Sequence, residues 1–290
     1  MEFFFDLLRS VAYGIIEGIT EWLPISSTGH MILAEQLLKF SFDPAFMEMF
    51  RVVIQLGAIL AVVVLYFRKL WPFCTDNGED VGFARHLRWP VVRLWCKILV
   101  ACLPAAVLGL LLDDWLDAHL YNSLVVAVML IVYGVAFLLL ERRPRVPRTT
   151  KLGRITYRQA LIVGAWQVLA MIPGTSRSGA TIVGGLLCGM SRPCVSQFTF
   201  FLAIPVMAGA SGLKLVKFLV AGNAFTGAEI AALIVGCVVA FLVSMVAIRF
   251  LMNYVKRHTF VAFGWYRIAL GVVVLAVWAV QTFVLQAPAV

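Results

Sequence analysis

Six long apolar runs divide this chain of 290 residues and limit the folds open to it. They cover about residues 46–67, 91–112, 120–140, 195–218, 230–250 and 260–283. Each run could cross a bilayer, which takes about 20 helical residues. A helix satisfies its own backbone groups in lipid. With 62% hydrophobic residues and a mean hydropathy of +0.95, the sequence predicts an all-α, polytopic integral membrane protein and excludes a soluble domain.

A polar cluster, EGITEWLPISSTGH at residues 17–30, interrupts the apolar sequence before the first of these runs. Glu17 and Glu21 are four residues apart and share one face of a helix. Pro24 should end that helix, because it lacks an amide hydrogen and clashes with the preceding turn. A second helix should begin at the serines. Its free amides and positive dipole end would favour an anion such as phosphate, bound by Ser26, Ser27, Thr28 and Gly29.

Two carboxylates beside a phosphate would repel it unless a cation lay between them. We therefore expect Glu17 and Glu21 to hold a divalent metal with oxygen ligands, Mg²⁺ or Ca²⁺. A helix start with a solvated acidic face is the structural alternative. Ionisable residues at membrane depth are costly, however, and usually have a function.

A second polar cluster, PGTSRSG at residues 173–179, repeats this design. The planar guanidinium of Arg177 suits two phosphate oxygens at once. Glycines let backbone amides approach a ligand closely. Substrate contacts are therefore expected from Gly174, Thr175, Ser176, Ser178 and Gly179. The alternative is that Arg177 pairs with Glu17 or Glu21 only to neutralise buried charge.

The two clusters indicate an internal repeat within a single membrane domain, residues 1–290. Setting Gly14 on Gly164 and Pro24 on Pro173 aligns Ser26–Ser27 with Thr175–Ser176, and Glu17 with Gln167 after a one-residue gap. Residues 1–140 form the first half, 141–155 a basic cytoplasmic linker, and 156–290 the second half. Basic segments mark cytoplasmic loops, and this assignment inverts the two halves. Each cluster then lies in a re-entrant helix-loop-helix pair, as in transporters with broken helices. One long tilted span is the alternative for each pair.

The combined clusters supply the parts of phosphoryl transfer, in which positioning and charge neutralisation give most of the rate. Ser27 is the first choice of nucleophile, and a serine needs a base. His30, three residues further on, shares its helical face and could be that base, or the acid for the leaving phosphate. Alternatively, a metal-bound water attacks with Glu21 as base and Ser27 only binds phosphate. The sequence does not separate these mechanisms.

These motifs together resemble the undecaprenyl-diphosphate phosphatase family, the integral membrane enzymes linked to bacitracin resistance. The resemblance covers nearly the whole chain and rests on residues 17–30, FRVVIQLGAILAVV at 50–63, TYRQALIVG at 156–164 and PGTSRSGAT at 173–181. It implies hydrolysis of undecaprenyl diphosphate to the monophosphate carrier used in cell-wall peptidoglycan synthesis. It also implies a bacterial inner membrane location, a site open to the periplasmic side, a divalent cation, and roles for Glu17, Glu21, Ser27, His30 and Arg177. The family commonly has Glu where this chain has Gln197.

The main rival is a transporter or flippase for polyprenyl phosphates or phosphorylated solutes, because inverted repeats with a midplane anion site also describe carriers. The expected partners are the polyprenyl diphosphate substrate and membrane lipids. The net charge of +9 is concentrated between apolar runs, as membrane orientation requires, and no nucleic-acid motif accompanies it. A homodimer is compatible with the sequence.

Overall fold

The structure, a computed structural model, describes residues 2–73, 87–142 and 146–284, and it is built from helices. Within these ranges the only strand pairing is two isolated bridges, at Phe73 and at Thr149. The α-helices are α1 (Glu2–Thr20), α2 (Ser27–Leu37), α3 (Pro44–Val53), α4 (Gln55–Leu65), α5 (Phe67–Leu70), α6 (Trp89–Leu120), α7 (Ser123–Arg142), α8 (Tyr157–Val168), α9 (Arg177–Leu187), α10 (Arg192–Val220), α11 (Gly227–Tyr254) and α12 (Val261–Ala279).

Six helical segments in the described ranges are long and apolar enough to cross a membrane. They are Pro44–Leu65, Trp89–Gly109, Ser123–Arg142, Arg192–Val220, Gly227–Tyr254 and Val261–Phe283. The expected all-α, polytopic fold with six spans is thereby confirmed. The first span differs from the expectation in one respect, because it breaks at Ile54 into α3 and α4.

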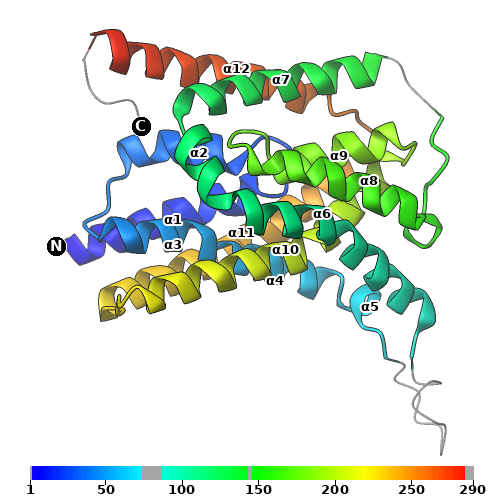
Figure 1. The fold of residues 1–290 in the computed structure, drawn as a ribbon, viewed down its shortest axis with the longest axis horizontal. Helices are drawn as coiled ribbons and strands as arrows, with labels where there is room; N and C mark the ends of the chain where they lie inside the picture. Colours follow the sequence, from blue (N-terminus) through cyan, green and yellow to red (C-terminus); the bar gives the residue numbers. More distant parts are fainter. Residues whose placement is uncertain (1, 74–86, 143–145, 285–290) are drawn as a thin grey trace, which may run out of the picture.

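The spans enclose the two broken helix pairs. α7 and α12 lie along each other and form the upper layer of the bundle in Figure 1. α1 packs against α11, and α8 packs in the same way against α6. α10 contacts α3, α4 and α9, so it connects the second broken pair to the first full span.

The second span is part of a helix longer than its apolar run. That run ends at about residue 112, but α6 continues through residues 113–117 to Leu120. Helix propagation adds a hydrogen bond for each residue that it fixes, so a helix need not end where its apolar run ends. In the linker, 143–145 lie outside the described residues. In the described remainder of the linker, the amides of Arg148 and Thr149 donate to the carbonyl of Gly189 at 2.8 and 3.1 Å.

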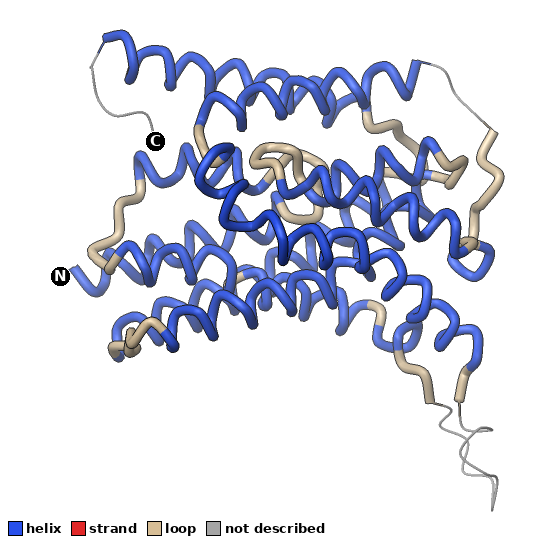
Figure 2. The backbone as a smooth tube through the Cα atoms, viewed as in Figure 1, coloured by secondary structure: helices blue, strands red, loops and turns tan. Residues whose placement is uncertain are grey.

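Each broken pair consists of two helices that meet at an irregular segment. α1 ends at Thr20 and α2 begins at Ser27, whereas α8 is followed by a 3₁₀ turn, Leu169–Met171, and α9 begins at Arg177. The second helix of this later pair therefore includes Arg177, Ser178 and Gly179, the last three residues of the second polar cluster. In Figure 2 loop segments lie near the middle of the bundle, between helical layers. We call residues 21–26 the first loop and residues 172–176 the second loop.

Candidate active site

The first loop presents the start of α2 toward the interior of the bundle. Ser26 is the N-cap residue, and its side-chain oxygen accepts a hydrogen bond from the amide of Gly29 at 3.4 Å. Its φ of 73° lies in the left-handed region, which is unusual for a residue with a side chain. Glu21 falls in the turn just after α1, but its amide still donates to the carbonyl of Glu17 at 3.0 Å. The two carboxylates are thus one helical turn apart, as predicted.

The second loop has the same local structure. Ser176 is the N-cap of α9, has a φ of 68°, and accepts from the amide of Gly179 at 3.2 Å. Among the described residues, Ser26 and Ser176 are the only non-glycine residues with positive φ. Gly174 also has a positive φ, 88°, and an added Cβ would lie 2.5 Å from the carbonyl oxygen of Val126. Only glycine fits there without movement of the backbone.

This correspondence corrects the expected alignment of the two clusters. Ser26 matches Ser176 in conformation and in its cap bond, so Ser27 matches Arg177 and no gap is needed. The aligned prolines caused the error, because Pro24 and Pro173 do not stand at equivalent places. In this corrected alignment, Gln167 of the second half still corresponds to Glu17 of the first half.

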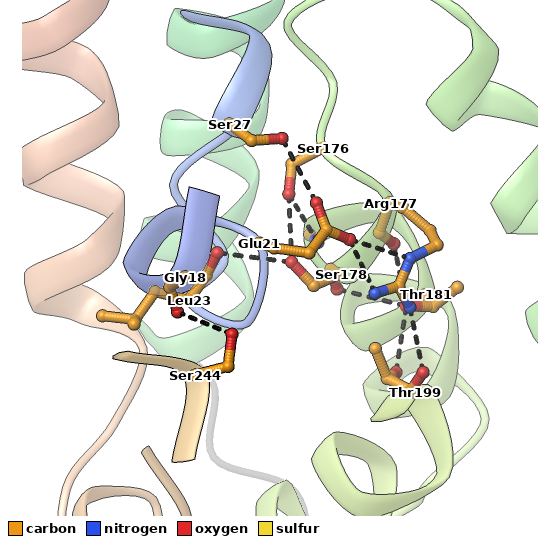
Figure 3. Close-up of polar contacts among 11 residues, drawn as sticks. Gly18, Glu21, Leu23, Ser27, Ser176, Arg177, Ser178, Thr181, Thr199 and Ser244 are labelled. Carbon is orange, nitrogen blue, oxygen red and sulfur yellow. Dashed lines mark hydrogen bonds and ion pairs between the residues drawn. The ribbon is translucent and has the colours of Figure 1, made fainter. Parts of the chain in front are cut away.

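The two loops meet at Glu21, as Figure 3 shows. Arg177 donates from Nη2 and Nε to the same carboxylate oxygen, Oε1, at 2.8 and 3.3 Å. The hydroxyl of Ser27 donates to the other oxygen, Oε2, at 3.2 Å. Ser178 donates to the carbonyl of Leu23 at 3.3 Å. The structure therefore brings Arg177 to Glu21, which is 156 residues away in the sequence and also binds Ser27.

The Arg177–Glu21 pair lies inside the protein. The two side chains are only 10% and 9% exposed. Burial of an ion pair costs desolvation energy that the attraction must offset, so a pair alone is weak evidence for stability. Hydroxyl groups and two helix starts adjoin this pair. Mutual neutralisation of the two charges alone would not require them.

Three residues that the sequence reasoning missed hold Arg177 in place. Its Nη1 donates to the carbonyl of Thr199 on α10 at 2.9 Å, and its guanidinium lies over the ring of Trp22, 5.9 Å from the centroid. Thr181 on α9 donates to the carbonyl of Arg177 at 2.9 Å and accepts a hydrogen bond from the hydroxyl of Thr199 at 2.9 Å. The available signal was a threonine within the apolar segment SQFTFFLAIP, two residues after Gln197.

Glu17 is buried, with 1% exposure, and its Oε1 has no hydrogen-bond partner. A buried carboxylate with an unsatisfied oxygen is costly unless it is protonated or meets a cation. No group of three or more His, Cys, Asp or Glu side chains comes together in the described part of the chain. The oxygens of Glu17, Glu21 and Ser27 are nevertheless donors of the kind that Mg²⁺ and Ca²⁺ prefer. The residues present fit such a cation.

His30 contacts neither Ser27 nor Glu21 through a described hydrogen bond. Its Nδ1 lies 2.7 Å from the carbonyl oxygen of Ser26, and its Nε2 lies 2.8 Å from the hydroxyl of Tyr266 on α12. A carbonyl only accepts, so Nδ1 carries the proton, and neutral Nε2 accepts from Tyr266. In this arrangement the hydroxyl of Ser27 has Glu21, rather than the expected His30, as its acceptor.

The other predicted contact residues line the two helix starts. Thr175 is fully buried, and its hydroxyl has no partner. The hydroxyls of Ser176 and Ser178 lie 3.1 Å apart. Thr28 and Gly29 occupy the first turn of α2, and Ser178 and Gly179 occupy the first turn of α9.

The fold and this site define a class: a multi-pass helical membrane protein whose interior brings together two helix starts, the Arg177–Glu21 ion pair and a second carboxylate, Glu17. That arrangement suits a phosphorylated lipid, because helix starts and arginine both bind phosphate. Comparison with known proteins agrees. Residues 10–273 match the family model described as bacitracin resistance protein BacA.

Three relatives share most of their length with this chain. The undecaprenyl-diphosphatase of Enterococcus faecalis strain V583 is 57% identical, over 95% of this chain and 98% of the relative. A protein of the same name from Streptococcus thermophilus is 53% identical, over 97% of this chain and 96% of the relative. Another from Desulfitobacterium hafniense is 54% identical, over 96% of this chain and 98% of the relative. The chain belongs to the bacitracin resistance protein BacA family, which confirms the resemblance seen in its motifs.

Proposed function

We propose that the two loops form the active site at which this chain, an undecaprenyl-diphosphatase, removes the terminal phosphate of undecaprenyl diphosphate. The activity follows from the family and from relatives of that name. The observation that carries the site assignment is the buried contact of Arg177 with Glu21, which also accepts from Ser27. A nucleophile, a base and a phosphate ligand thus lie within one hydrogen-bonded group.

Each loop would bind part of the diphosphate. The free amides at the starts of α2 and α9 favour negative charge, and Arg177 would exchange its bonds to Glu21 for phosphate oxygens. The guanidinium stays oriented during this exchange, because Thr199 accepts from Nη1 on the far side. Negative charge that develops on the phosphate oxygens in the transition state then meets donors already in position.

Glu21 is the base that the geometry favours for the first step. The Ser27 hydroxyl already donates to Oε2 of Glu21. When Ser27 attacks the terminal phosphorus, its proton passes to Glu21, the bond to the bridging oxygen breaks, and undecaprenyl phosphate leaves. Water then hydrolyses the phosphoserine to inorganic phosphate. In the alternative, water attacks directly with Glu21 as base and Ser27 binds a phosphate oxygen.

Glu17, Glu21 and Ser27 would hold a divalent cation, Mg²⁺ or Ca²⁺. When bound, such a cation neutralises charge on the phosphate oxygens. The unsatisfied oxygen of Glu17 supports this assignment. His30 sits one turn further along α2. Its unprotonated Nε2 would first take up a proton, once Tyr266 releases it, and would then act as acid for the leaving phosphate.

The membrane arrangement is part of the proposal. The two broken pairs would enter the bacterial inner membrane from opposite sides, with the site open to the periplasm. Matching cap geometry at Ser26 and Ser176 supports an inverted repeat, as does the packing of α1 on α11 and of α8 on α6. Cysteines placed singly at 115 and 150 in a chain without other cysteines would test it. A membrane-impermeant maleimide added to whole cells should label the first position and not the second, whereas the reverse pattern contradicts the orientation.

A direct assay tests the function. Purified protein in detergent, given undecaprenyl diphosphate and Mg²⁺, should release inorganic phosphate and leave undecaprenyl phosphate. Protein carrying Glu21→Gln serves as the control for contaminating phosphatases. If the parent releases no more phosphate than this variant under any divalent cation, the rival carrier function is favoured instead.

A further inference from the structure

Arg267 is a buried cation in the last membrane span. None of the sequence motifs points to it. It lies on α12 and has no exposed surface. None of the five ion pairs found among the described residues includes it. An arginine in such a position is costly and usually has a function. Its guanidinium lies over the ring of Tyr133, 5.5 Å from the centroid.

The donors of Arg267 go to backbone carbonyls of both loops. Nη1 donates to Pro24 of the first loop at 3.3 Å. Nη2 donates to Gly174 and Thr175 of the second loop at 2.8 and 2.9 Å. Longer contacts of 3.5 Å reach the carbonyls of Met129 and Leu130 on α7. One side chain therefore connects both loops to the layer formed by α7 and α12.

The guanidinium also lies against the start of α9. A Cβ added at Gly179 would be 3.1 Å from Nη1 of Arg267, and Gly179 donates to the cap oxygen of Ser176. Arg267 is thus beside one of the two helix starts that bind phosphate in the proposed function.

We infer that Arg267 is a positioning residue for the phosphatase reaction, which holds the two loops in register so that Arg177, Ser27 and Glu21 can act together. The inference rests on the proposed site. Irregular backbone at membrane depth needs partners for its carbonyls, and Arg267 supplies them for both loops at once. A residue that belonged to one loop could not fix the other.

The carbonyl bonds also orient an amide. The described peptide bonds are trans, so the N–H and the C=O of one peptide unit point in opposite directions. Thr175 directs its carbonyl at Arg267. The N–H of Ser176, in the same peptide unit, must therefore point away from Arg267. This places one more donor at the start of α9 without any contact between Arg267 and the substrate.

Lysine cannot replace this function. The planar guanidinium directs five N–H donors outward in fixed directions, whereas an ammonium is a single point at the end of a flexible chain. Arg267→Lys keeps the charge but cannot reach carbonyls of both loops in the same geometry. A shift of the reacting groups by about 1 Å can lower the rate on the order of 100-fold.

The test compares Arg267→Lys and Arg267→Gln with the parent and with Lys97→Met. Lys97 is the matched control, since it is also a buried cation in a span and donates to one carbonyl, that of Gly153, at 3.2 Å. Phosphate release from undecaprenyl diphosphate gives kcat and KM per folded protein, and the melting temperature reports stability. We expect kcat of both Arg267 variants to fall about 100-fold, with KM little changed. Lys97→Met should keep the kcat of the parent although its melting temperature is similar to that of the Arg267 variants.

Three outcomes would overturn the inference. The first is a kcat near that of the parent in Arg267→Lys. The second is a loss of kcat in Lys97→Met that equals the loss in the Arg267 variants. The third is failure of both Arg267 variants to fold while Lys97→Met folds, which would assign Arg267 to the stability of the fold alone. If the parent itself releases no phosphate, it is the proposed function that fails.

Discussion

Replacement of Arg177 by lysine should reduce turnover strongly while the protein remains folded. Arg177 uses three nitrogens in this structure, two toward Glu21 and one toward Thr199. The donors of lysine all radiate from one nitrogen, so they cannot occupy the separate positions of Nε, Nη1 and Nη2 that face Glu21 and Thr199. The charge is retained, which limits the effect on stability.

The expected magnitude follows from the loss of transition-state donors. Removal of one donor to a developing oxyanion costs about 2.7–4 kcal/mol, or 10²–10³ in kcat. The side chain of Arg177 is only 10% exposed, so water does not replace the lost donor. Because lysine keeps the charge, we expect the lower end of this range, a fall of about 100-fold in kcat.

Arg192→Lys is the matched control. Arg192 binds Glu141 through Nε, at 2.8 Å, and through Nη2, so it also forms an arginine–carboxylate pair, partly buried and between α10 and α7, away from the loops. Phosphate release from undecaprenyl diphosphate should fall in Arg177→Lys and remain near the parent rate in Arg192→Lys. Equal activity of Arg177→Lys and the parent would remove Arg177 from the site and refute the reasoning.

Three further variants test the other parts of the site. Glu21→Gln should lose nearly all turnover, and the activity that remains should need more Mg²⁺. Phosphate release measured against Mg²⁺ concentration tests this, and an unchanged metal dependence would mean that the carboxylate is structural. Ser27→Ala separates the two mechanisms, since a loss of several orders of magnitude in kcat supports a nucleophile and a modest loss supports a phosphate ligand. Gly174→Ala should lower the free energy of unfolding by more than about 1 kcal/mol, because an added Cβ would meet Val126 at 2.5 Å. Gly222→Ala, also at positive φ but with no atom within 4 Å of an added Cβ, should have a smaller effect on the melting temperature.

The spans could be predicted because hydropathy is a local property of the sequence, and because a helix satisfies its own backbone hydrogen bonds in lipid. A run of about 20 apolar residues has few alternatives in lipid other than a helix, and Pro24 and Pro173 indicate where two helices break. The break at Ile54 has no such signal. That residue is apolar and precedes no proline, and the interruption is visible only where α3 and α4 bend in the packed bundle.

The site was predictable only to the extent that it is local in sequence. Glu21, Ser27 and Arg177 stand in polar clusters that apolar surroundings make conspicuous, and the structure brings them together. Tyr266 and Arg267 lie inside an apolar run far from both clusters, and only the packing of α12 places them against the loops. The acceptor of the Ser27 hydroxyl, Glu21, lies in the same cluster, but the irregular backbone of the first loop brings the two together, whereas helical spacing pointed to His30.

The most direct test of the account is an experimental structure of the full chain with a non-hydrolysable diphosphate analogue of the lipid substrate. The account predicts that one phosphate group lies within hydrogen-bond distance of both Ser27 and Arg177. A phosphate bound to only one of the two loops, or an uninterrupted helix in place of either loop, would contradict it.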